Sequence, residues 1–212
     1  MKIELINVSY TYSTNIDFGK KIIDDVNITV EEGKVLLVLG PNGCGKTTLL
    51  QIMALLLKPT SGKVLINGED AWENPSKYRK NIGIAFQFPE NQFFSLSVYE
   101  EVTFAPKNFG VKNLEEMYRK VMEMFELDPE EFRNRVPFTL SGGEKRKVGI
   151  ASIISYDPEI IILDEPLVSL DWEGRFEMLK YIKKWKDMGK GFAIATHHEE
   201  LFEGIADGAL VL

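Results

Sequence analysis

The sequence has one cysteine, two histidines and no long apolar run. A single cysteine, Cys44, cannot form an intramolecular disulfide, which agrees with a reducing compartment. The longest apolar runs, VLLVL at 35–39 and IIIL at 160–163, are far shorter than the roughly 20 residues of a membrane-spanning helix. The start, MKIELINV, lacks the basic and then apolar layout of an export signal, so we expect the chain to stay in the cytoplasm.

Basic residues are also fewer than acidic ones. Lys and Arg number 25 against 32 Asp and Glu, which gives a formal net charge of −7. A protein that binds nucleic acid by neutralising its phosphates needs a clustered basic surface, so we expect no nucleic-acid partner. With 212 residues, of which 44% are hydrophobic, the chain is large enough for one globular domain with a full core.

Three short, almost wholly apolar runs predict central strands of a parallel sheet that is covered on both faces. They are KVLLVLG at 34–40, IIILDEP at 160–166 and GFAIAT at 191–196. Between the second and third runs, residues 171–189 predict a helix that Gly189 ends. Its expected apolar face comprises Phe176, Leu179, Ile182 and Trp185.

The parts outside this core have different patterns. Residues 2–12 and 22–33 predict short antiparallel strands, followed by GKVLING with a turn at Asn67-Gly68. From about Pro89 to Pro158 the patterns are helical. We therefore expect one α/β domain, in which 1–88 and 159–212 form the core with an antiparallel β subdomain and 89–158 form an inserted helical subdomain.

A phosphate-binding loop lies between the first predicted strand and a helix. Gly40-x-x-x-x-Gly45-Lys46-Thr47 matches the P-loop pattern in the required strand, turn and helix setting. Its backbone N–H groups would converge on the phosphates, Lys46 would reach the β- and γ-phosphates, and the Thr47 hydroxyl would ligate Mg²⁺. The expected nucleotide-binding residues are Gly40, Pro41, Asn42, Gly43, Cys44, Gly45, Lys46, Thr47 and Thr48. We therefore expect an α/β fold of the P-loop NTPase (RecA-like) class.

Two consecutive acids end the second predicted strand. Successive side chains of a strand point to opposite faces, so Asp164 and Glu165 can serve different purposes. We expect Asp164 to hold Mg²⁺ through water, and Glu165 to polarise the water that attacks the γ-phosphate. A solvated acidic turn is the alternative, but it leaves unexplained why acids follow four apolar residues in a chain with a phosphate loop.

Polar side chains also follow other predicted strands. His197 comes directly after the third run and is expected at the edge of the parallel sheet where ligands bind, as a γ-phosphate contact. His198, which points the other way, is the second candidate. Gln87 follows the apolar run IGIAF and is a candidate contact for the attacking water or for Mg²⁺.

The motifs in this order resemble those of the ATP-binding-cassette (ABC) ATPases. They are GPNGCGKTT, Gln87, LSGGEKRKV at 140–148, ILDEP, SLD at 169–171 and TH at 196–197. The resemblance implies ATP and Mg²⁺ as ligands and a pair of cassettes, in a homodimer or a heterodimer with a related cassette. In such a pair, the signature residues of one cassette close over the nucleotide of the other. Those residues are Ser141, Gly142, Gly143 and Glu144. The alternative interpretation is that this segment is only a capped surface helix with a basic face.

The resemblance assigns two further residues. Tyr12 takes the place of the aromatic that stacks on adenine, with Tyr10 as the second candidate. Asp171 matches the loop that couples the two sites of the pair. Either tyrosine could instead be an ordinary strand aromatic.

The stretch FQFPENQFFSLSVYEEVTFAPKNFG at 86–110 is similar to the ATPases of energy-coupling-factor and cobalt/nickel importers. This similarity implies a peripheral protein at the cytoplasmic face of the membrane, with a transmembrane coupling subunit and a substrate-binding membrane subunit as partners. The apolar side chains of the stretch 86–110 would either form a groove for a helix of the membrane partner or fill the junction between the two lobes. They are Phe88, Phe93, Phe94 and Leu96.

Members of that subfamily commonly continue into a further C-terminal domain that helps to hold the pair together without nucleotide, whereas the sequence given ends at ADGALVL. Two other functions compete with import. A soluble ABC ATPase that acts on ribosomes or DNA usually has tandem cassettes or a long coiled-coil insertion, and the segment between the motifs is short here. A P-loop kinase of small molecules is disfavoured by LSGGEKRKV and SLD.

Overall fold

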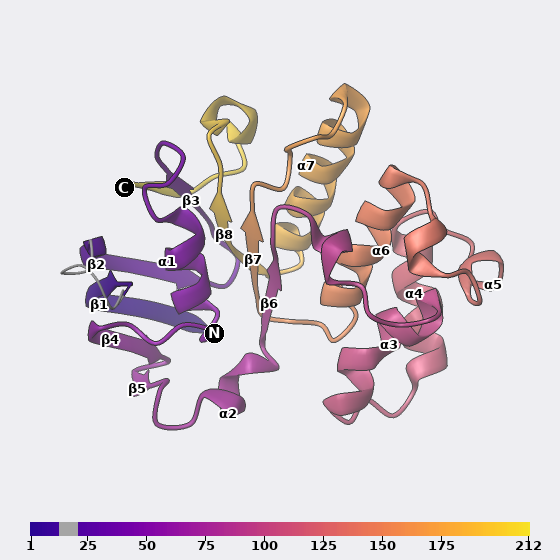
Figure 1. Ribbon diagram of the computed structural model, residues 1–212, viewed down its shortest axis with the longest axis horizontal. Coiled ribbons are helices and arrows are strands. Elements are labelled where there is room, and N and C mark those ends of the chain that lie inside the picture. Colours follow the sequence, from indigo (N-terminus) through magenta and orange to yellow (C-terminus); the bar gives the residue numbers. More distant parts are fainter. Residues whose placement is uncertain (13–20) are drawn as a thin grey trace. The chain divides into compact units, whose positions relative to one another are not determined.

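The computed structural model describes residues 1–12 and 21–212, and the chain divides into two units (Figure 1). The first unit comprises Met1–Ile84 and Glu159–Leu212, and the second comprises Ala85–Pro158. The expected helical insertion began at 89, so the observed division lies four residues earlier. Gln87 thus lies in the second unit, where the buried Arg146 donates a hydrogen bond from Nη1 to the Gln87 backbone oxygen at 2.7 Å.

An antiparallel sheet in the order β2-β1-β4-β5 forms part of the first unit. Its strands are β1 (Lys2–Thr11), β2 (Lys21–Glu31), β4 (Ser61–Ile66) and β5 (Glu69–Asp70). Ile3 of β1 lies opposite Val30 of β2 and Ile66 of β4, and all three side chains are buried. The predicted turn joins β4 to β5, since Asn67 and Gly68 both have the positive φ angles that a tight hairpin turn requires.

The second sheet has the order β6-β7-β8-β3-β9, and its β7–β8, β8–β3 and β3–β9 pairs are parallel. Its strands are β6 (Ile82–Ala85), β7 (Ile160–Asp164), β8 (Gly191–Ala195), β3 (Val35–Leu39) and β9 (Gly208–Val211). Every residue of β7 and β8 is buried, which explains why these strands read as continuous apolar runs. The edge strand β9 was not predicted, because it is short, begins with glycine and has no fully buried residue.

Helix α1 (Lys46–Met53) follows the phosphate loop and joins the two sheets into one core. It contacts β2 of the antiparallel sheet and β7 and β8 of the parallel sheet (Figure 1). Leu49, Leu50 and Ile52 of α1 are fully buried in this core. The start of α1, where the phosphate site is expected, is therefore held from two sides.

Helix α7 (Trp172–Asp187) packs on the parallel sheet, and the Trp185 ring stacks on Phe192 of β8 with 6.5 Å between their centroids. Gly189, with φ of 91°, follows the helix as predicted. The predicted apolar face was wrong in part, because the Phe176 side chain is 67% exposed. The buried face consists instead of Met178, Tyr181, Ile182 and Trp185.

The second unit is helical. It contains η1 (Pro89–Gln92), α3 (Val98–Asn108), α4 (Leu114–Met124), α5 (Pro129–Phe132), η2 (Pro137–Thr139) and α6 (Gly142–Ile154). The remaining short helices, α2 (Pro75–Arg79) and η3 (Glu199–Phe202), belong to the first unit. Tyr118 and Phe125 are fully buried in the second unit, and the Tyr118 ring contacts Tyr99 edge to face at 4.9 Å.

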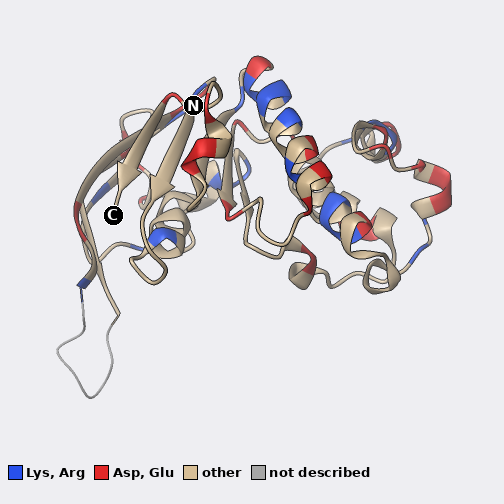
Figure 2. Cartoon of the chain, turned by 90° about the horizontal axis from the view of Figure 1, so that it is seen from above, with Lys and Arg blue, Asp and Glu red and all other residues tan. Residues whose placement is uncertain are grey.

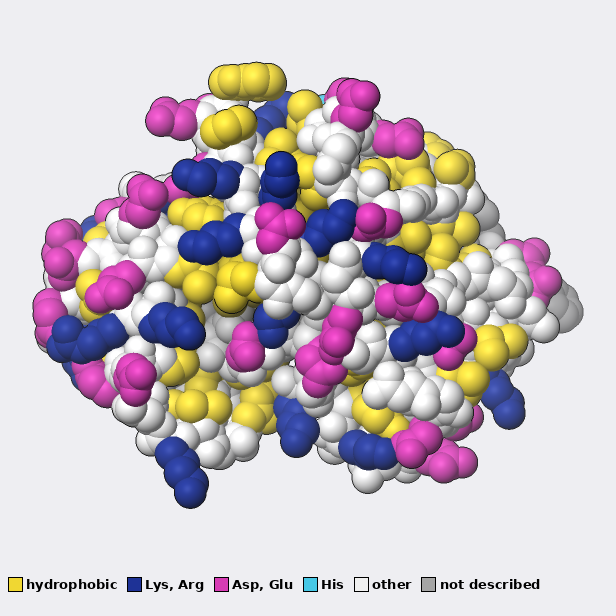
Figure 3. Space-filling view, turned by 180° about the vertical axis from the view of Figure 1, so that it is seen from behind, with side chains coloured by type: hydrophobic (Ala, Val, Ile, Leu, Met, Phe, Trp, Pro, Cys, Tyr) yellow, Lys and Arg dark blue, Asp and Glu magenta, His cyan; other side chains and the backbone are white. Residues whose placement is uncertain are grey.

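Charged residues of both signs are interspersed along the elements (Figure 2). On the face seen in Figure 3, lysine and arginine side chains lie among acidic ones, with hydrophobic side chains exposed between them. Within 1–12 and 21–212, no helix has the length and apolarity to span a membrane.

Candidate nucleotide site

The phosphate loop connects β3 to α1 and depends on the glycine at its end. Gly45, the N-cap of α1, has a left-handed conformation with φ of 112°. A Cβ atom at this position would lie 2.8 Å from Ile23 Cδ1 and 3.0 Å from the Ile22 backbone oxygen, so a larger residue cannot fit. The loop thus lies against β2, and the first N–H groups of α1 are directed along the helix axis toward an incoming anion.

Lys46 is held inside the loop that it belongs to. Its Nζ atom donates hydrogen bonds to the backbone oxygens of Gly40 at 2.7 Å and Pro41 at 3.2 Å, and the residue is only 7% exposed. The Glu165 Oε1 atom lies 3.8 Å from the same nitrogen. A buried ammonium group with flexible carbonyl partners can exchange them for phosphate oxygens when a nucleotide binds.

The next residue, Thr47, contacts the first of the two strand-end acids. Its Oγ1 atom donates a hydrogen bond to Asp164 Oδ2 at 2.6 Å. Asp164 is 6% exposed, and burial raises the pKa of its carboxyl group, although the Thr47 hydrogen bond lowers it in part. A hydroxyl group next to a carboxylate is an oxygen donor set that suits Mg²⁺, whose remaining ligands are usually water and phosphate oxygens.

Glu165 lies between Lys46 and His197. Its backbone has φ of 49°, and its N–H donates to the Ala195 oxygen at 2.9 Å, which ties the turn after β7 to the end of β8. Its Oε2 atom lies 3.0 Å from Nδ1 of His197, whose side chain is 49% exposed. The Glu165 carboxylate therefore lies near the Lys46 ammonium group of the phosphate loop on one side and contacts the solvent-facing His197 imidazole on the other.

The two histidines have different partners. His198 Nδ1 lies 3.1 Å from Glu200 Oε1, and its backbone N–H donates to Thr196 Oγ1 at 3.0 Å. Its ring is 4.0 Å from that of His197. Of the two candidates, only His197 is joined to Glu165 by the hydrogen bonds found among the described residues.

Tyr12 lies beside the start of α1. Its hydroxyl group is 3.3 Å from Thr48 Oγ1, and its side chain is 46% exposed. The Tyr10 ring contacts the Tyr12 ring edge to face at 4.9 Å. Tyr12 therefore presents an accessible aromatic surface on the phosphate-loop side of β1.

The signature segment forms the start of α6 in the second unit. Ser141 and Glu144 make a reciprocal capping box: the Ser141 N–H donates to Glu144 Oε2 at 2.7 Å, and the Glu144 N–H donates to Ser141 Oγ at 3.4 Å. A Cβ atom on Gly142 or Gly143 would have no neighbour within 4 Å. The packing of this chain therefore does not require glycine at either position, and the two residues leave the helix N-terminus accessible to an external ligand.

Sequence reasoning missed residues that support this segment. Arg135 contacts Glu144, with 3.1 Å between Nη1 and Oε1, and lies 3.6 Å from Glu131 Oε1. The Ser141 backbone hydrogen bond is the main reason why the pKa of Glu144 lies below its usual value. The S-x-x-E spacing is a recognised capping signal and could have predicted the role of Glu144. No pattern in the sequence near Arg135 predicts its contact with Glu144.

The structure brings some predicted residues together and assigns others elsewhere. Within the first unit it places Lys46, Thr47, Asp164, Glu165 and His197 in one connected group. Gln87 and the signature residues belong to the second unit. Asp171 caps α7, where its Oδ1 atom accepts a hydrogen bond from the Gly174 N–H at 2.8 Å.

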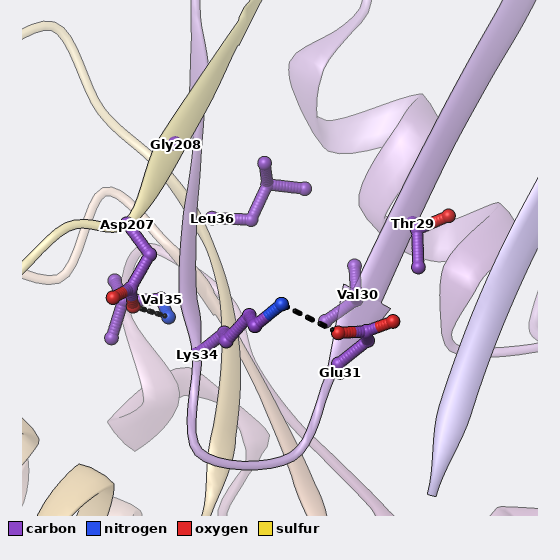
Figure 4. A pocket seen from close by; sticks show the side chains of 8 residues that line it. All are labelled: Thr29, Val30, Glu31, Lys34, Val35, Leu36, Asp207 and Gly208. Atoms are coloured by element: carbon purple, nitrogen blue, oxygen red, sulfur yellow. Dashed lines mark hydrogen bonds and ion pairs between the residues drawn. The ribbon is translucent and has the colours of Figure 1, made fainter.

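A separate cavity of about 250 Å³ lies at the amino ends of β3 and β9 (Figure 4). Its charged groups are already paired. Lys34 Nζ lies 2.8 Å from Glu31 Oε2, and Asp207 Oδ2 accepts a hydrogen bond from the Val35 N–H at 2.7 Å and lies 2.8 Å from Lys186 Nζ. This cavity is at the opposite end of β3 from the phosphate loop, so it is distinct from the nucleotide site.

The site consists of a glycine-rich loop between a buried strand and a helix, then a lysine and a hydroxyl residue that face two acids at a strand end. This combination defines a P-loop nucleotide hydrolase. Comparison with known proteins narrows this class. The sequence profile of the ABC transporter family matches residues 23–168. The chain belongs to this family and is an ABC ATPase.

Relatives and solved structures agree with this assignment. The chain is 47% identical to the energy-coupling factor transporter ATP-binding protein EcfA2 of Thermotoga maritima, over all of this chain and 79% of that protein. It is 38% identical to EcfA2 of Clostridium acetobutylicum, over all of this chain and 76% of that protein. The structure of cbiO1 from Clostridium perfringens, part of the ABC transporter complex cbiONQ, is similar with a TM-score of 0.84 and 30% identity, over 99% of this chain and 83% of that one. A dimeric ABC cassette in a post-hydrolysis state with ADP and Pi is similar with a TM-score of 0.84 and 29% identity, over 94% of this chain and 89% of that one.

Proposed function

We propose that this chain is the ATP-hydrolysing subunit that energises an importer of the energy-coupling-factor type, for a vitamin or a cobalt or nickel ion, at the cytoplasmic face of the membrane. The observation that carries the proposal is the group in which Thr47 contacts Asp164 at 2.6 Å and Glu165 lies between Lys46 and His197. The similarity of the whole of this chain to EcfA2 proteins supports the import role. It disfavours the soluble ABC ATPase without a membrane partner.

In the proposed reaction, each site residue of the first unit has its own role. Lys46 exchanges its contacts with Gly40 and Pro41 for the β- and γ-phosphates, and Tyr12 stacks on the adenine. Thr47 directly and Asp164 through water would hold Mg²⁺, which supplies positive charge against the phosphates when it is bound. Glu165 accepts a hydrogen bond from the attacking water and polarises it, while His197 orients Glu165 and contacts the γ-phosphate. Gln87, which belongs to the second unit, is kept as a candidate contact for the attacking water or for Mg²⁺ on its sequence position alone.

The signature residues complete the site of a second cassette. Ser141 orders the N-terminus of α6, whose positive end is directed at the γ-phosphate bound by the partner. Gly142 and Gly143 allow that phosphate to approach the backbone, because nothing in this chain fills the space beside them. ATP then holds two cassettes together, and hydrolysis removes the shared ligand. The partner is a second copy of this chain or a related cassette.

An exposed aromatic patch on the second unit supports a transmembrane coupling subunit as a further partner. Its members are Phe88, Phe94, Leu96, Phe104 and Phe138, with exposures from 38% to 80%. The buried Glu101 carboxylate shapes this patch, since its Oε2 atom accepts hydrogen bonds from the N–H groups of Phe94 at 3.1 Å and Ser95 at 3.0 Å. The Phe94 ring contacts Phe104 edge to face at 4.6 Å. Such a surface suits an apolar face of a partner helix, whereas Phe93 is buried and helps to support it.

Co-purification and catalysis test the proposal together. The tagged chain, expressed in its source organism and extracted in mild detergent, is expected to bring with it a transmembrane coupling subunit and a substrate-binding membrane subunit and to hydrolyse ATP. A Leu96→Asp, Phe104→Asp chain should lose the membrane subunits and still bind ATP, because the patch is not part of the nucleotide site. Recovery of an active ATPase without membrane subunits would contradict the import role, and transfer of phosphate to a molecule other than water would contradict the ATPase role.

A further inference from the structure

The dipeptide Asn-Gly occurs twice in the sequence, and both copies lie in turns. One copy is Asn42-Gly43 in the phosphate loop, and the other is Asn67-Gly68 in the hairpin turn between β4 and β5. All four residues are exposed, and each glycine has a positive φ angle. A Cβ atom on Gly43 or Gly68 would have no neighbour within 4 Å, so the space beside both glycines is open.

An Asn-Gly pair can modify itself without an enzyme, because glycine has no Cβ atom to shield its backbone nitrogen. After this nitrogen loses its proton to hydroxide, it attacks Cγ of the preceding asparagine and closes a five-membered succinimide ring. The Cγ–Nδ2 bond breaks, and the nitrogen leaves as ammonia after taking up a proton from water. A second water molecule opens the ring and leaves aspartate or isoaspartate. The net reaction is the hydrolysis of an amide to a carboxyl group and ammonia.

The hairpin pair is firmly held. Asn67 Oδ1 accepts a hydrogen bond from the Lys2 N–H at 2.8 Å, and the Asn67 N–H donates to the Lys2 oxygen at 2.9 Å. The strands on both sides of the turn are paired, since Ile66 lies opposite Glu69. These contacts oppose the rotation that would bring the amide carbon of Asn67 to the Gly68 nitrogen.

Asn42 has no such restraint. Within residues 1–12 and 21–212, its side chain takes part in no hydrogen bond or ion pair. The turn around it is closed by a long hydrogen bond from the Cys44 N–H to the Pro41 oxygen, at 3.4 Å. Gly43 follows with φ of 79° and open space beside it. The amide carbon of Asn42 is therefore able to approach the Gly43 nitrogen, whereas the hairpin opposes the same movement at position 67.

We propose that Asn42 is a modification site, at which the empty phosphate loop loses an amide and a bound nucleoside triphosphate prevents the loss. The protection rests on the proposed function, in which the backbone N–H groups of the loop donate to the phosphates. A Gly43 N–H that donates to a phosphate oxygen is a poorer nucleophile, because it must give up that contact and its proton before the nitrogen attacks. The modification itself needs only the empty loop and water.

The product impairs the loop in which it forms. Aspartate at position 42 places a negative charge one residue from Pro41, whose backbone oxygen accepts a hydrogen bond from Lys46 Nζ at 3.2 Å. This charge repels a triphosphate. Isoaspartate adds a methylene group to the backbone, so that the N–H groups of Gly43 and Cys44 change direction. Either product should weaken ATP binding about tenfold or more. A chain that stays empty therefore loses its activity with time, and an occupied chain keeps it.

The test follows both Asn-Gly pairs in the full chain during incubation in mildly alkaline buffer. One set of samples contains no nucleotide, and the other contains Mg²⁺ and a saturating non-hydrolysable ATP analogue. Peptide maps by mass spectrometry give the fractions of asparagine, aspartate and isoaspartate at positions 42 and 67. Calorimetry gives the affinity for the analogue once the nucleotide has been removed. Asn42→Gln and Asn67→Gln are the matched variants, because the longer side chain of glutamine closes a ring far more slowly.

We expect Asn42 in the empty chain to be modified about fivefold faster than Asn67, the factor that one or two hydrogen bonds confer. The analogue should slow the modification of Asn42 about tenfold or more and leave the rate at Asn67 unchanged. Affinity should fall with time in the wild type and in Asn67→Gln, while Asn42→Gln should keep its own starting affinity throughout.

Three results would overturn the inference: an Asn42 that keeps its amide while Asn67 loses it, a bound analogue that does not slow the modification, or an equal fall of affinity in Asn42→Gln. A fresh chain that fails to bind the analogue would contradict the nucleotide site and the protection together. The calorimetry reports that failure separately, because the peptide maps of the empty chain show in any case whether Asn42 is modified.

Discussion

Two neighbouring residues at the start of α1 face two neighbouring acids at the end of β7. The Thr47 hydroxyl group donates to Asp164 at 2.6 Å, and the Lys46 ammonium group lies 3.8 Å from Glu165. In this arrangement the polar groups that would hold nucleotide and metal satisfy one another, so that none of the three buried residues, Lys46, Asp164 and Glu165, is left without a polar neighbour. Nucleotide binding must therefore replace existing contacts, which favours a ligand that brings several charged oxygens at once.

Glu165→Gln tests the role of the second acid. The amide keeps the size of the side chain and a hydrogen-bonding oxygen but no longer attracts a proton from the attacking water. We expect ATP to bind with affinity similar to that of the wild type, while kcat falls about 100-fold or more. ATPase assays and size-exclusion chromatography with ATP measure both effects, since the slowed chain should accumulate as a dimer. Unchanged turnover would remove Glu165 from the proposed role.

The two histidines provide a matched pair. His197→Ala removes the contact with Glu165 at 3.0 Å, whereas His198→Ala removes only the contact with the exposed Glu200 at 3.1 Å. We expect His197→Ala to lower kcat by about 10- to 100-fold with little change in KM, because the histidine orients the carboxylate and contacts the γ-phosphate that the water attacks. His198→Ala should stay within about threefold of the wild type. Steady-state kinetics of both variants decide the assignment, and the reverse order of effects would transfer the role to His198.

Much of the fold and of the first-unit site could be predicted because the signals are local. The phosphate loop combines fixed residue spacing with a strand and a helix, and β7 and β8 are apolar throughout because both faces are covered. The apolar face of α7 was predicted poorly for a geometric reason. Each three-residue step falls about 60° short of a full helical turn, so the direction changes by roughly half a turn between Phe176 and Trp185. One end of the predicted row therefore faces solvent and the other faces the core.

Contacts between residues that are distant in the sequence could not be predicted. The hydrogen bond from Arg146 to the Gln87 backbone oxygen joins residues 59 positions apart, and nothing near either residue indicates it. Arg135 likewise supports Glu144 from another element. The capping box, by contrast, has a local signal, because Ser141 and Glu144 have the S-x-x-E spacing.

Glu144 gives a stability prediction with a defined pH dependence. Hydrogen bonds from Ser141 lower the pKa of Glu144 from its model-peptide value of 4.5, so the carboxylate stabilises the fold above that value. This contribution is lost as the pH falls through the lower pKa of the folded state. We expect Glu144→Ala to lower the free energy of unfolding by roughly 1 kcal/mol at pH 7. Urea unfolding of Glu144→Gln at pH 7 and at pH 3 should show a smaller difference between the two pH values than the wild type shows, and an equal difference would contradict the assignment.

Mixing two inactive chains tests whether the reaction centre is shared. Lys46→Ala lacks the phosphate-loop cation but keeps its signature residues, whereas Ser141→Arg keeps its phosphate loop but blocks the accessible start of α6. Each chain alone should lose nearly all ATPase activity. In a mixed dimer, one site combines the intact Lys46 of one chain with the intact Ser141 of the other, so activity should return.

The control for this experiment is a mixture of Lys46→Ala with the double variant Lys46→Ala, Ser141→Arg, in which no site has an intact lysine. It should remain inactive at every ratio, while the informative mixture should be most active near equal amounts of the two chains. ATPase assays across mixing ratios, with dimer formation followed by light scattering, measure the effect. If the informative mixture is as inactive as its parents although mixed dimers form, each cassette must complete its own site, and the accessible glycines of the signature then need another explanation.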